Sequence, residues 1–495
     1  MFRQFFVVFM LLMTSAGSAM GPEAQEVMQQ RIVDYFETYK GNDPDAYAAW
    51  LKDNRTREAY SMAPLDARLE MYSFDAERWG GLELSEIEFP EPTLGVAEAR
   101  PVNGGMPVRV TFQFEDEEPF LIGPMMVGIA FDVPQNWSDL DSFTQQVIDE
   151  SGIPALAIGV MKEGEIIAQA VRGRKMLGQA DVVQSNDTFH WGSITKSVTG
   201  TMIAKLIENG DLDWGTTIAE VLGDIPMRDE YRNVTISQLM SHEAGIQQYN
   251  DFSPEMVDEI VAAAKGDRWQ DKRRAFVSRV LMEEPLAPPG EVHAYSNAGI
   301  TIAGYMAEVV TGKSWRALIE AHVFRPYGMT TAGFDWPASP ERPNQPVGHW
   351  GDSAANYEAM EYGQMEDLIN ILAPAGNIRS SIADLMRYGN AHLEGMSGKD
   401  GYLRAETVKR LHTARPDAVP WGDSFYTWGW GHNECGHFFD APKCQAHNGG
   451  AGTFYAEIKL IPGRNMVLAY MANAAEPSEA IAAEVLAAVY EHYAK

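Results

Sequence analysis

The chain has few cysteines and few basic residues for its length. Among 495 residues there are only two cysteines, Cys435 and Cys444, which excludes the multiple-disulfide framework of small secreted domains. The 39 lysines and arginines are outnumbered by 69 aspartates and glutamates, giving a net charge of −30. Nucleic acids and anionic membranes need a basic surface, so we expect neither as a partner.

Apolar runs long enough to span a membrane, roughly 20 residues, are missing from the sequence. The first residues contain a shorter run: Arg3 precedes an apolar stretch over residues 5–13, and Gly17-Ser18-Ala19 resembles a small-residue cleavage site. This pattern predicts a secretory signal peptide over residues 1–19 and a mature protein in the periplasm or outside the cell. Met20 stands where a lipoprotein would carry a lipid-modified cysteine, so we expect no membrane anchor.

The two cysteines lie nine positions apart and allow two interpretations. In an exported protein, the default is a disulfide between Cys435 and Cys444 that closes a short loop. The alternative is a zinc site, because cysteines and histidines gather within sixteen residues: His432, Cys435, His437, Cys444 and His447. The spacing is wider and less regular than in common zinc motifs, so we favour the disulfide and expect no metal.

The residue pattern changes near positions 133–138, which predicts a small α+β module over residues 20–133 and a larger domain over residues 134–495. In the module, helical spacing of apolar residues predicts a helix over 26–51 that is broken at 41–44. Alternating runs predict strands over 82–89, 108–114 and 120–131, with turns at Pro90, Gly104-Gly105 and Gly123-Pro124. The module loosely resembles cone-shaped modules of the nuclear-transport-factor-2-like type.

The larger domain begins and ends with matching elements. A helix over 140–151 leads into a hairpin over 155–161 and 166–171, and a hairpin over 454–461 and 466–471 leads into a helix after residue 480. Between them lies a long, mostly helical insertion. Antiparallel strands from both ends, with helices packed against them, predict an α+β or α/β sandwich.

The insertion begins with Ser193-Ile194-Thr195-Lys196. A serine and a lysine three residues apart at the start of a helix place hydroxyl and ammonium one turn apart on one face. The lysine can then accept the serine proton or stabilise its ionised form. The alternative is a helix-capping serine followed by a solvent-facing lysine. A nucleophile elbow of the α/β-hydrolase type is excluded, because no Gly-x-Ser-x-Gly pentapeptide occurs.

A second motif, Tyr295-Ser296-Asn297, follows Pro288-Pro289-Gly290 and precedes a helical run. A tyrosine next to a cationic Lys196 would have a lowered pKa and act as a general base. The Asn297 amide would orient the lysine and a substrate carbonyl. The similar Tyr388-Gly389-Asn390 lies inside a helical stretch without a turn, so we interpret it as structural.

The third motif is His447-Asn448-Gly449-Gly450, directly before a strand near the C-terminus. Glycines at this position let a substrate backbone approach the strand. The backbone N–H groups of Gly450 and Ser193 would form an oxyanion hole. Two other His-x-Gly triplets, at 190–192 and 349–351, do not lead into such a strand.

Taken in this order, the three motifs resemble those of the serine β-lactamase and penicillin-binding-protein superfamily. The chain is most similar to the class C β-lactamase group with its related D-alanyl-D-alanine carboxypeptidases, D-aminopeptidases and esterases. Stretches 235–246, 326–329, 374–381 and 428–431 agree with that group. The resemblance covers the domain of residues 134–495 and implies a β-lactamase-like serine hydrolase domain.

The resemblance implies acyl transfer without a cofactor. Ser193 attacks a carbonyl, Lys196 and Tyr295 share its deprotonation, and Asn297 positions the substrate. His447 lines the opposite wall, beside Gly449, while the N–H groups of Ser193 and Gly450 hold the oxyanion. The substrate is expected to be a small molecule or peptidoglycan-like: an ester, a D-amino-acid peptide or a β-lactam.

One departure concerns the substrate. Class C β-lactamases carry a lysine where this chain has His447, and a neutral imidazole is a weaker partner for a carboxylate. The histidine favours the carboxypeptidase, D-aminopeptidase and esterase branches. Aromatic residues before it line an acyl pocket or, as we favour, belong to the core: Trp421, Tyr426, Trp428 and Trp430. Alternatives to the hydrolase are a non-catalytic binding module of the same fold and a zinc-binding protein.

Overall fold

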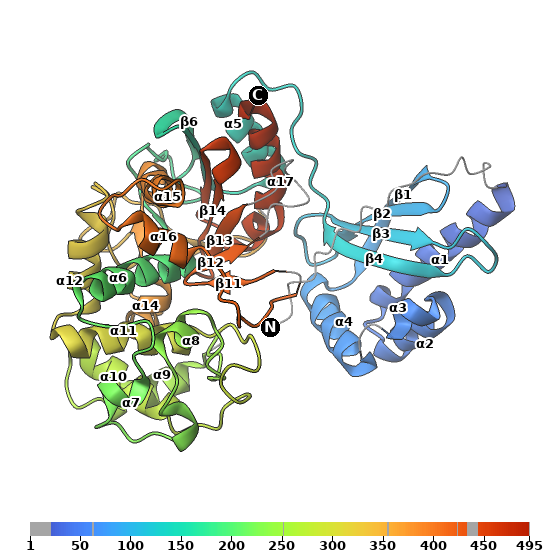
Figure 1. Cartoon of the computed structure of the whole chain (residues 1–495). Helices are drawn as coiled ribbons and strands as arrows, with labels where there is room; N and C mark the ends of the chain where they lie inside the picture. The colour runs from blue at the N-terminus through green and yellow to red at the C-terminus, as the bar shows by residue number, and fades with distance from the viewer. Residues whose placement is uncertain are drawn as a thin grey trace.

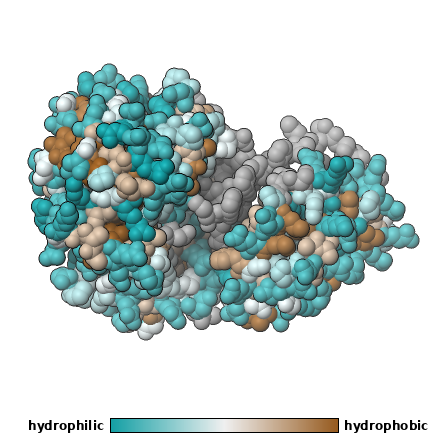
Figure 2. All heavy atoms as spheres, turned by 90° about the horizontal axis from the view of Figure 1, so that it is seen from below, coloured by the Kyte–Doolittle hydropathy of each residue, from teal (hydrophilic) through white to brown (hydrophobic). Residues whose placement is uncertain are grey.

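The computed structural model describes residues 21–61, 64–250, 252–353, 356–422, 424–432 and 444–494. The predicted signal peptide and Cys435 lie outside these residues, so both the cleavage site and the disulfide remain predictions. Within these ranges no helix has the length and apolar character needed to cross a membrane. Figure 1 shows a smaller N-terminal module beside a larger domain, and Figure 2 shows a mostly hydrophilic surface over both.

The N-terminal module packs helices against one antiparallel sheet of strand order β1-β2-β3-β4. Its core is aromatic: Tyr35 of the first helix packs edge-on against Phe112 of the third strand, with ring centroids 5.4 Å apart. The elements are α1 (Pro22–Lys40), α2 (Pro44–Asn54), α3 (Arg57–Ser61), α4 (Leu65–Trp79), β1 (Leu82–Glu91), β2 (Leu94–Pro101), β3 (Val108–Phe114) and β4 (Ile122–Ile129).

Two turns predicted in this module are wrong, and three elements were not predicted. Pro90 lies within β1 and Gly123-Pro124 within β4, and in both strands the pairing register shifts around the proline. Both are edge strands, where a bulge tolerates a residue without an N–H group. Strand β2 was missed because its buried residues, Ala97 and Ala99, are only weakly apolar. Helices α3 and α4 were missed as well.

The larger domain contains the predicted antiparallel sheet, built from both of its ends. The strand order is β11-β12-β13-β14-β15-β5-β6, so the first hairpin pairs with the last one through β15 and β5. This confirms the predicted fold class. The strands are β5 (Ala155–Lys162), β6 (Glu165–Gly173), β11 (Tyr426–Thr427), β12 (Trp430–His432), β13 (Gln445–Gly450), β14 (Tyr455–Ile461) and β15 (Met466–Ala472).

Apolar side chains alternate between the two faces of this sheet, and both faces are buried. Leu468 and Tyr470 of β15 face one cluster with the terminal helices α5 (Leu140–Ser151) and α17 (Ala475–Tyr493). Val467 and Ala469 face the opposite cluster, which includes α15 (Ile382–Met396) and the helical insertion. The sheet is therefore the middle layer between two sets of helices (Figure 1).

The insertion supplies most of the helices and the surroundings of Ser193. Its other helices are α6 (Thr195–Asn209), α7 (Ile218–Leu222), α8 (Ile236–Met240), α9 (Pro254–Ala263), α10 (Trp269–Val280), α11 (Asn297–Thr311), α12 (Trp315–Ile319), α13 (Glu366–Ile371), α14 (Ala373–Gly376) and α16 (Ala405–Leu411). Short helical turns are η1 (Gly192–Ile194), η2 (Asp229–Tyr231), η3 (Glu320–Phe324) and η4 (Pro462–Arg464). Two small ladders pair β7 (Phe189–His190) with β10 (Arg379–Ser380) and β8 (His349–Trp350) with β9 (Glu358–Ala359).

Candidate active site

Ser193 lies on a tight turn between β7 and α6. The turn starts at Gly192, whose φ of +51° is a left-handed conformation that favours glycine. Ser193 itself is partly exposed, although the residues on either side of it are buried. The Trp191 N–H donates to the Ile378 carbonyl, which anchors the turn to the segment leading into β10. The local fold thus presents one reachable hydroxyl on a fixed support.

Lys196 is fully buried behind that hydroxyl. Its Nζ lies 2.8 Å from Ser193 Oγ and donates a hydrogen bond to the Ala375 carbonyl at 3.0 Å. Burial lowers the pKa of Lys196 well below its usual range. The interpretation of Lys196 as solvent-facing is therefore wrong. A neutral amine at this distance can accept the serine proton.

Tyr295 completes a triangle with these two residues. Lys196 Nζ lies 4.8 Å from the centre of the Tyr295 ring, and the phenol hydrogen-bonds Ser193. The expected lowering of the Tyr295 pKa is wrong: burial raises this pKa, and the hydrogen bond from Ser193 offsets only part of the rise. Tyr295 is therefore a protonated phenol, able to donate a proton.

The third motif forms the end of β13, directly against the nucleophile turn. Strand β12 pairs with β13 only at Gln445 and Ala446. On that side, the glycine end of β13 therefore contacts η1 and not β12. A Cβ on Gly192 would lie 2.8 Å from the Gly450 carbonyl oxygen. Gly450 itself is exposed, and a Cβ on it would meet no atom within 4 Å. The motif's backbone thus lies beside Ser193, with open space at Gly450.

His447 is buried, and both of its ring nitrogens have protein partners. Nδ1 donates to the Asn448 carbonyl, so Nε2 accepts from the Tyr426 hydroxyl, with an O–N distance of 2.9 Å. Burial, with a smaller contribution from Lys196, lowers the His447 pKa to about 3. His447 is therefore a neutral part of the wall and offers no charge to a substrate carboxylate.

Asn297 lies at the start of α11, with its side chain turned to a neighbouring loop. Its amide donates to the Tyr249 carbonyl at 3.0 Å and to Asn250 Oδ1 at 3.2 Å. Among the described residues no hydrogen bond joins Asn297 to Lys196, whose Nζ donates to the Ala375 carbonyl. The role of Asn297 toward a substrate remains a prediction.

The similar motifs elsewhere have structural surroundings. Tyr388 is buried in α15, where its hydroxyl donates to Ser197 Oγ at 3.0 Å. His190 and His349 are also buried. Of the aromatic residues before the third motif, Trp428 and Trp430 pack in the main core, as favoured, whereas Tyr426 contacts His447.

Two features of the site were not predicted. The Ala375 carbonyl has no sequence signature, because any residue supplies a backbone oxygen. His242 lies between Tyr295 and Tyr426, with ring centroids 4.4 and 4.6 Å away, and its Nδ1 accepts from the Ser296 N–H at 3.1 Å. His242 falls within the stretch 235–246, which resembles the family. That resemblance was the only sequence signal that could have placed His242 in the site.

Metal ligands do not cluster in the part of the chain that the structure describes. Cys444 is buried at the start of β13, whereas Cys435 and His437 lie outside the described residues. Of the five residues proposed as zinc ligands, the structure therefore describes His432, Cys444 and His447. These three do not form a metal-binding cluster.

Comparison with known proteins identifies the family of the chain. The chain belongs to the β-lactamase family, whose sequence profile matches residues 140–491. It is 27% identical over 330 residues to penicillin-binding protein 4 of Amycolatopsis lactamdurans, covering 66% of this chain and 82% of that protein. It is 26% identical to the unguisins hydrolase ungD of Aspergillus violaceofuscus, covering 65% of this chain but only 58% of that protein.

Solved structures show the same fold. The octameric penicillin-binding protein homologue from Pyrococcus abyssi superposes with a TM-score of 0.58 at 24% identity, covering 71% of this chain and 76% of that chain. A penicillin-binding protein from Bacillus halodurans gives a TM-score of 0.55 at 20% identity, covering 71% of this chain and all of that one. The family, together with a relative named as a hydrolase, supports the assignment of this chain to the serine hydrolases as a general class.

Proposed function

We propose that the protein hydrolyses an ester or amide through an acyl-enzyme on Ser193. The observation that carries the proposal is the buried Lys196 amine, 2.8 Å from Ser193 Oγ, with a pKa lowered by burial. The lowered pKa makes the Lys196 amine easier to deprotonate, and the amine is placed where the serine proton must go.

The chemistry follows from the protonation states. Lys196 Nζ takes the proton from Ser193 Oγ as the oxygen attacks the substrate carbonyl, and the N–H groups of Ser193 and Gly450 stabilise the resulting oxyanion. The Tyr295 phenol gives its proton to the leaving group and regains one from the Lys196 ammonium. Water then attacks the acyl-enzyme by the reverse proton path, which releases the acid and restores Ser193.

For the substrate we propose first an ester, and next a D-amino-acid peptide. His447 is neutral with both nitrogens already hydrogen-bonded, so it offers no charge to the carboxylate of a penicillin or to the C-terminal carboxylate of a D-Ala-D-Ala peptide. The relative named as an unguisins hydrolase supports hydrolysis, while the penicillin-binding relative keeps β-lactams and peptidoglycan-like peptides among the candidates.

A substrate panel tests this proposal directly. Nitrocefin, short-chain nitrophenyl esters and D-Ala-D-Ala peptides are assayed with the wild type, Ser193→Ala, and Ser138→Ala, which alters an exposed serine outside the site. We expect hydrolysis of an ester or peptide that is lost in Ser193→Ala and unchanged in Ser138→Ala. A serine-reactive phosphonate should add its mass to the wild type and to Ser138→Ala but not to Ser193→Ala. Activity that persists in Ser193→Ala would refute the mechanism.

We further propose that the protein is exported after cleavage behind Ala19, on the strength of the apolar run at residues 5–13. Expression of the full chain, fractionation and N-terminal sequencing test this. An N-terminus at Met20 in the exported fraction is expected, and an uncleaved intracellular protein would contradict it.

A further inference from the structure

A polar pocket of about 340 Å³ opens beside strand β10, away from the residues of the candidate active site. Seven of its lining residues carry hydrogen-bonding side chains without a negative charge: Asn186, Thr188, Thr331, Arg342, Asn344, Gln345 and Arg379. Glu341 is the acidic member of the lining, and it is exposed. Two arginines in one small pocket are notable in a chain with a net charge of −30.

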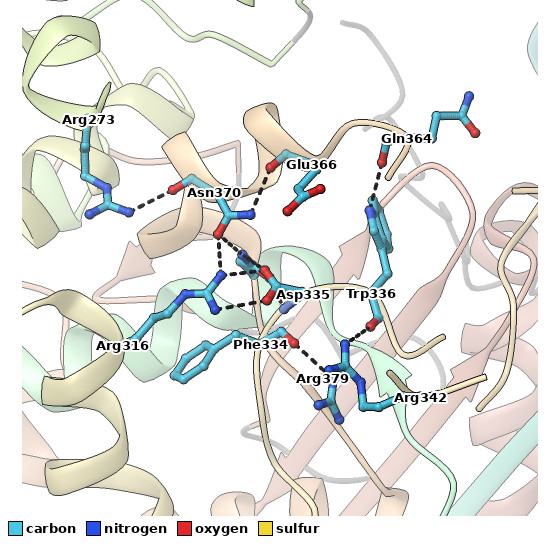
Figure 3. Close-up of polar contacts among 11 residues, drawn as sticks. Arg273, Arg316, Phe334, Asp335, Trp336, Arg342, Gln364, Glu366, Asn370 and Arg379 are labelled. Carbon is cyan, nitrogen blue, oxygen red and sulfur yellow. Dashed lines mark hydrogen bonds and ion pairs between the residues drawn. The ribbon is translucent and has the colours of Figure 1, made fainter. Parts of the chain in front are cut away.

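Both guanidinium groups are held by neutral oxygens (Figure 3). Arg379 Nε donates to the Phe334 carbonyl at 3.0 Å, and Arg342 donates to the carbonyls of Pro337 and Trp336 at 3.1 and 2.9 Å. Across the described ranges, Arg342 Nη1 and Arg379 Nη2 have no hydrogen-bond acceptor. Each arginine therefore keeps donors for a ligand.

The acidic groups nearby are engaged with other partners. Asp187 pairs with Lys175 at 3.0 Å, Asp335 pairs with Arg316, and Glu341 accepts from Ser339 Oγ at 2.9 Å. Neither Arg342 nor Arg379 forms an ion pair with any residue that the structure describes. Burial and, to a smaller extent, the neighbouring Arg342 lower the pKa of Arg379 to about 10, against a smaller opposing contribution from Asp335.

We propose that this pocket binds the phosphate group of a small molecule. Two guanidinium groups approach from different elements, and a phosphate offers oxygens in several directions. A carboxylate is satisfied by one bidentate arginine, which leaves the second cation unpaired. The pocket volume leaves room for more than the phosphate itself.

The position of the pocket links it to the nucleophile turn. Arg379 pairs with His190 in the β10–β7 ladder, and Ser193 follows three residues later. A ligand on Arg379 would therefore stabilise the support of η1. The binding claim does not depend on the proposed hydrolase activity.

Binding is tested with inorganic phosphate as the probe, by calorimetry and thermal unfolding, against chloride and acetate at equal ionic strength. The variants are Arg342→Gln, Asn186→Asp, which adds a negative charge at an exposed lining position, and the control Arg325→Gln, whose side chain is 76% exposed elsewhere. We expect saturable phosphate binding that weakens at least tenfold in the first two variants and is unchanged in the control.

The proposal is overturned if phosphate raises Tm no more than chloride does, or if acetate binds as tightly as phosphate. It is also overturned if Arg342→Gln and Asn186→Asp bind phosphate like the wild type. Because Asn186 is exposed, Asn186→Asp remains informative if Arg342→Gln fails to fold.

Discussion

Gly449 and Ser193 are in such close backbone contact that no side chain fits between them. A Cβ placed on Gly449 would lie 2.5 Å from the Ser193 amide nitrogen and 2.1 Å from the Trp191 carbonyl oxygen. Both neighbours are backbone atoms, so neither can rotate away. The glycine of the third motif is thus required for strand β13 to reach the nucleophile turn.

Gly449→Ala is therefore expected to separate β13 from η1 and to misplace the proposed oxyanion hole. Loss of one oxyanion donor typically costs about 10²–10³ in kcat, so a loss of at least about 100-fold is expected. Steady-state kinetics with the best substrate of the panel measure it. The matched control is Gly463→Ala, an exposed position in η4 where a Cβ meets no atom within 4 Å, so both the activity and the circular dichroism spectrum should be unchanged. Equal activity in Gly449→Ala and the wild type would contradict the argument.

The pH dependence of the reaction should report Lys196. Its pKa is lowered by burial in the folded protein, and activity requires the neutral amine. Activity is therefore expected to fall as the pH drops through this lowered pKa, and to stay high above it. A kcat/KM profile measures this acid limb. An acid limb that is unchanged in an active Lys196 variant, such as Lys196→His, would assign it to another group.

Lys196→Met should abolish activity without lowering stability. A lysine with a lowered pKa in the folded state binds fewer protons there than when unfolded, so its burial reduces stability below its unfolded pKa, and this penalty disappears as the pH rises. Methionine removes the penalty at pH 7 and fills a similar volume. Tm is expected to match or exceed that of the wild type, with kcat reduced by at least about 10³-fold. A large drop in Tm would show that the lysine stabilises the fold.

Tyr295 should act as a proton donor over the whole working range. Burial raises its pKa, so the phenol stays protonated and no loss of activity from its ionisation is expected up to pH 10. Tyr295→Phe removes the donor but keeps the ring, and a loss of about 10²–10⁴ in kcat is expected. The effect should shrink for nitrophenyl esters, whose leaving group needs no proton. A loss of the same size for esters and peptides would argue against proton donation.

The buried pair of Arg273 and Glu308 is expected to matter for stability rather than catalysis. Their side chains are 3% and 4% exposed with an N–O distance of 2.6 Å, and Arg273 also donates to the Asn370 carbonyl (Figure 3). Arg273→Met leaves the Glu308 charge buried and unpaired, which should cost about 3–5 kcal/mol in the free energy of unfolding. Urea unfolding measures it.

The neighbouring Arg274 provides the control for that variant. Its ion pair with Asp224 is largely exposed, so Arg274→Met should change the free energy of unfolding by less than about 1 kcal/mol. If both variants cost the same, burial is not what makes the Arg273 pair important.

Much of the larger domain was predictable because its signals are local. The hairpins 155–171 and 454–471 have continuous apolar runs with clear turns, and the sheet order follows from their pairing. The N-terminal module was less predictable because Pro90 and Pro124 look like turn residues, and only their place on edge strands shows that they lie at bulges. Asn297 shows the same limit in the site, since its amide orientation depends on a loop almost fifty residues away.

The sequence by itself determined which reactive groups are present: Ser193 and Lys196 one helical turn apart, then Tyr295, then the glycines of the third motif. Only the tertiary structure decided their protonation states. The pKa of a lysine, a phenol or an imidazole depends on how completely neighbours from distant segments remove water around it. That burial lowered the pKa of Lys196 and raised the pKa of Tyr295, which was expected to fall, so that of the two expected bases the lysine is the better base and the phenol the better proton donor.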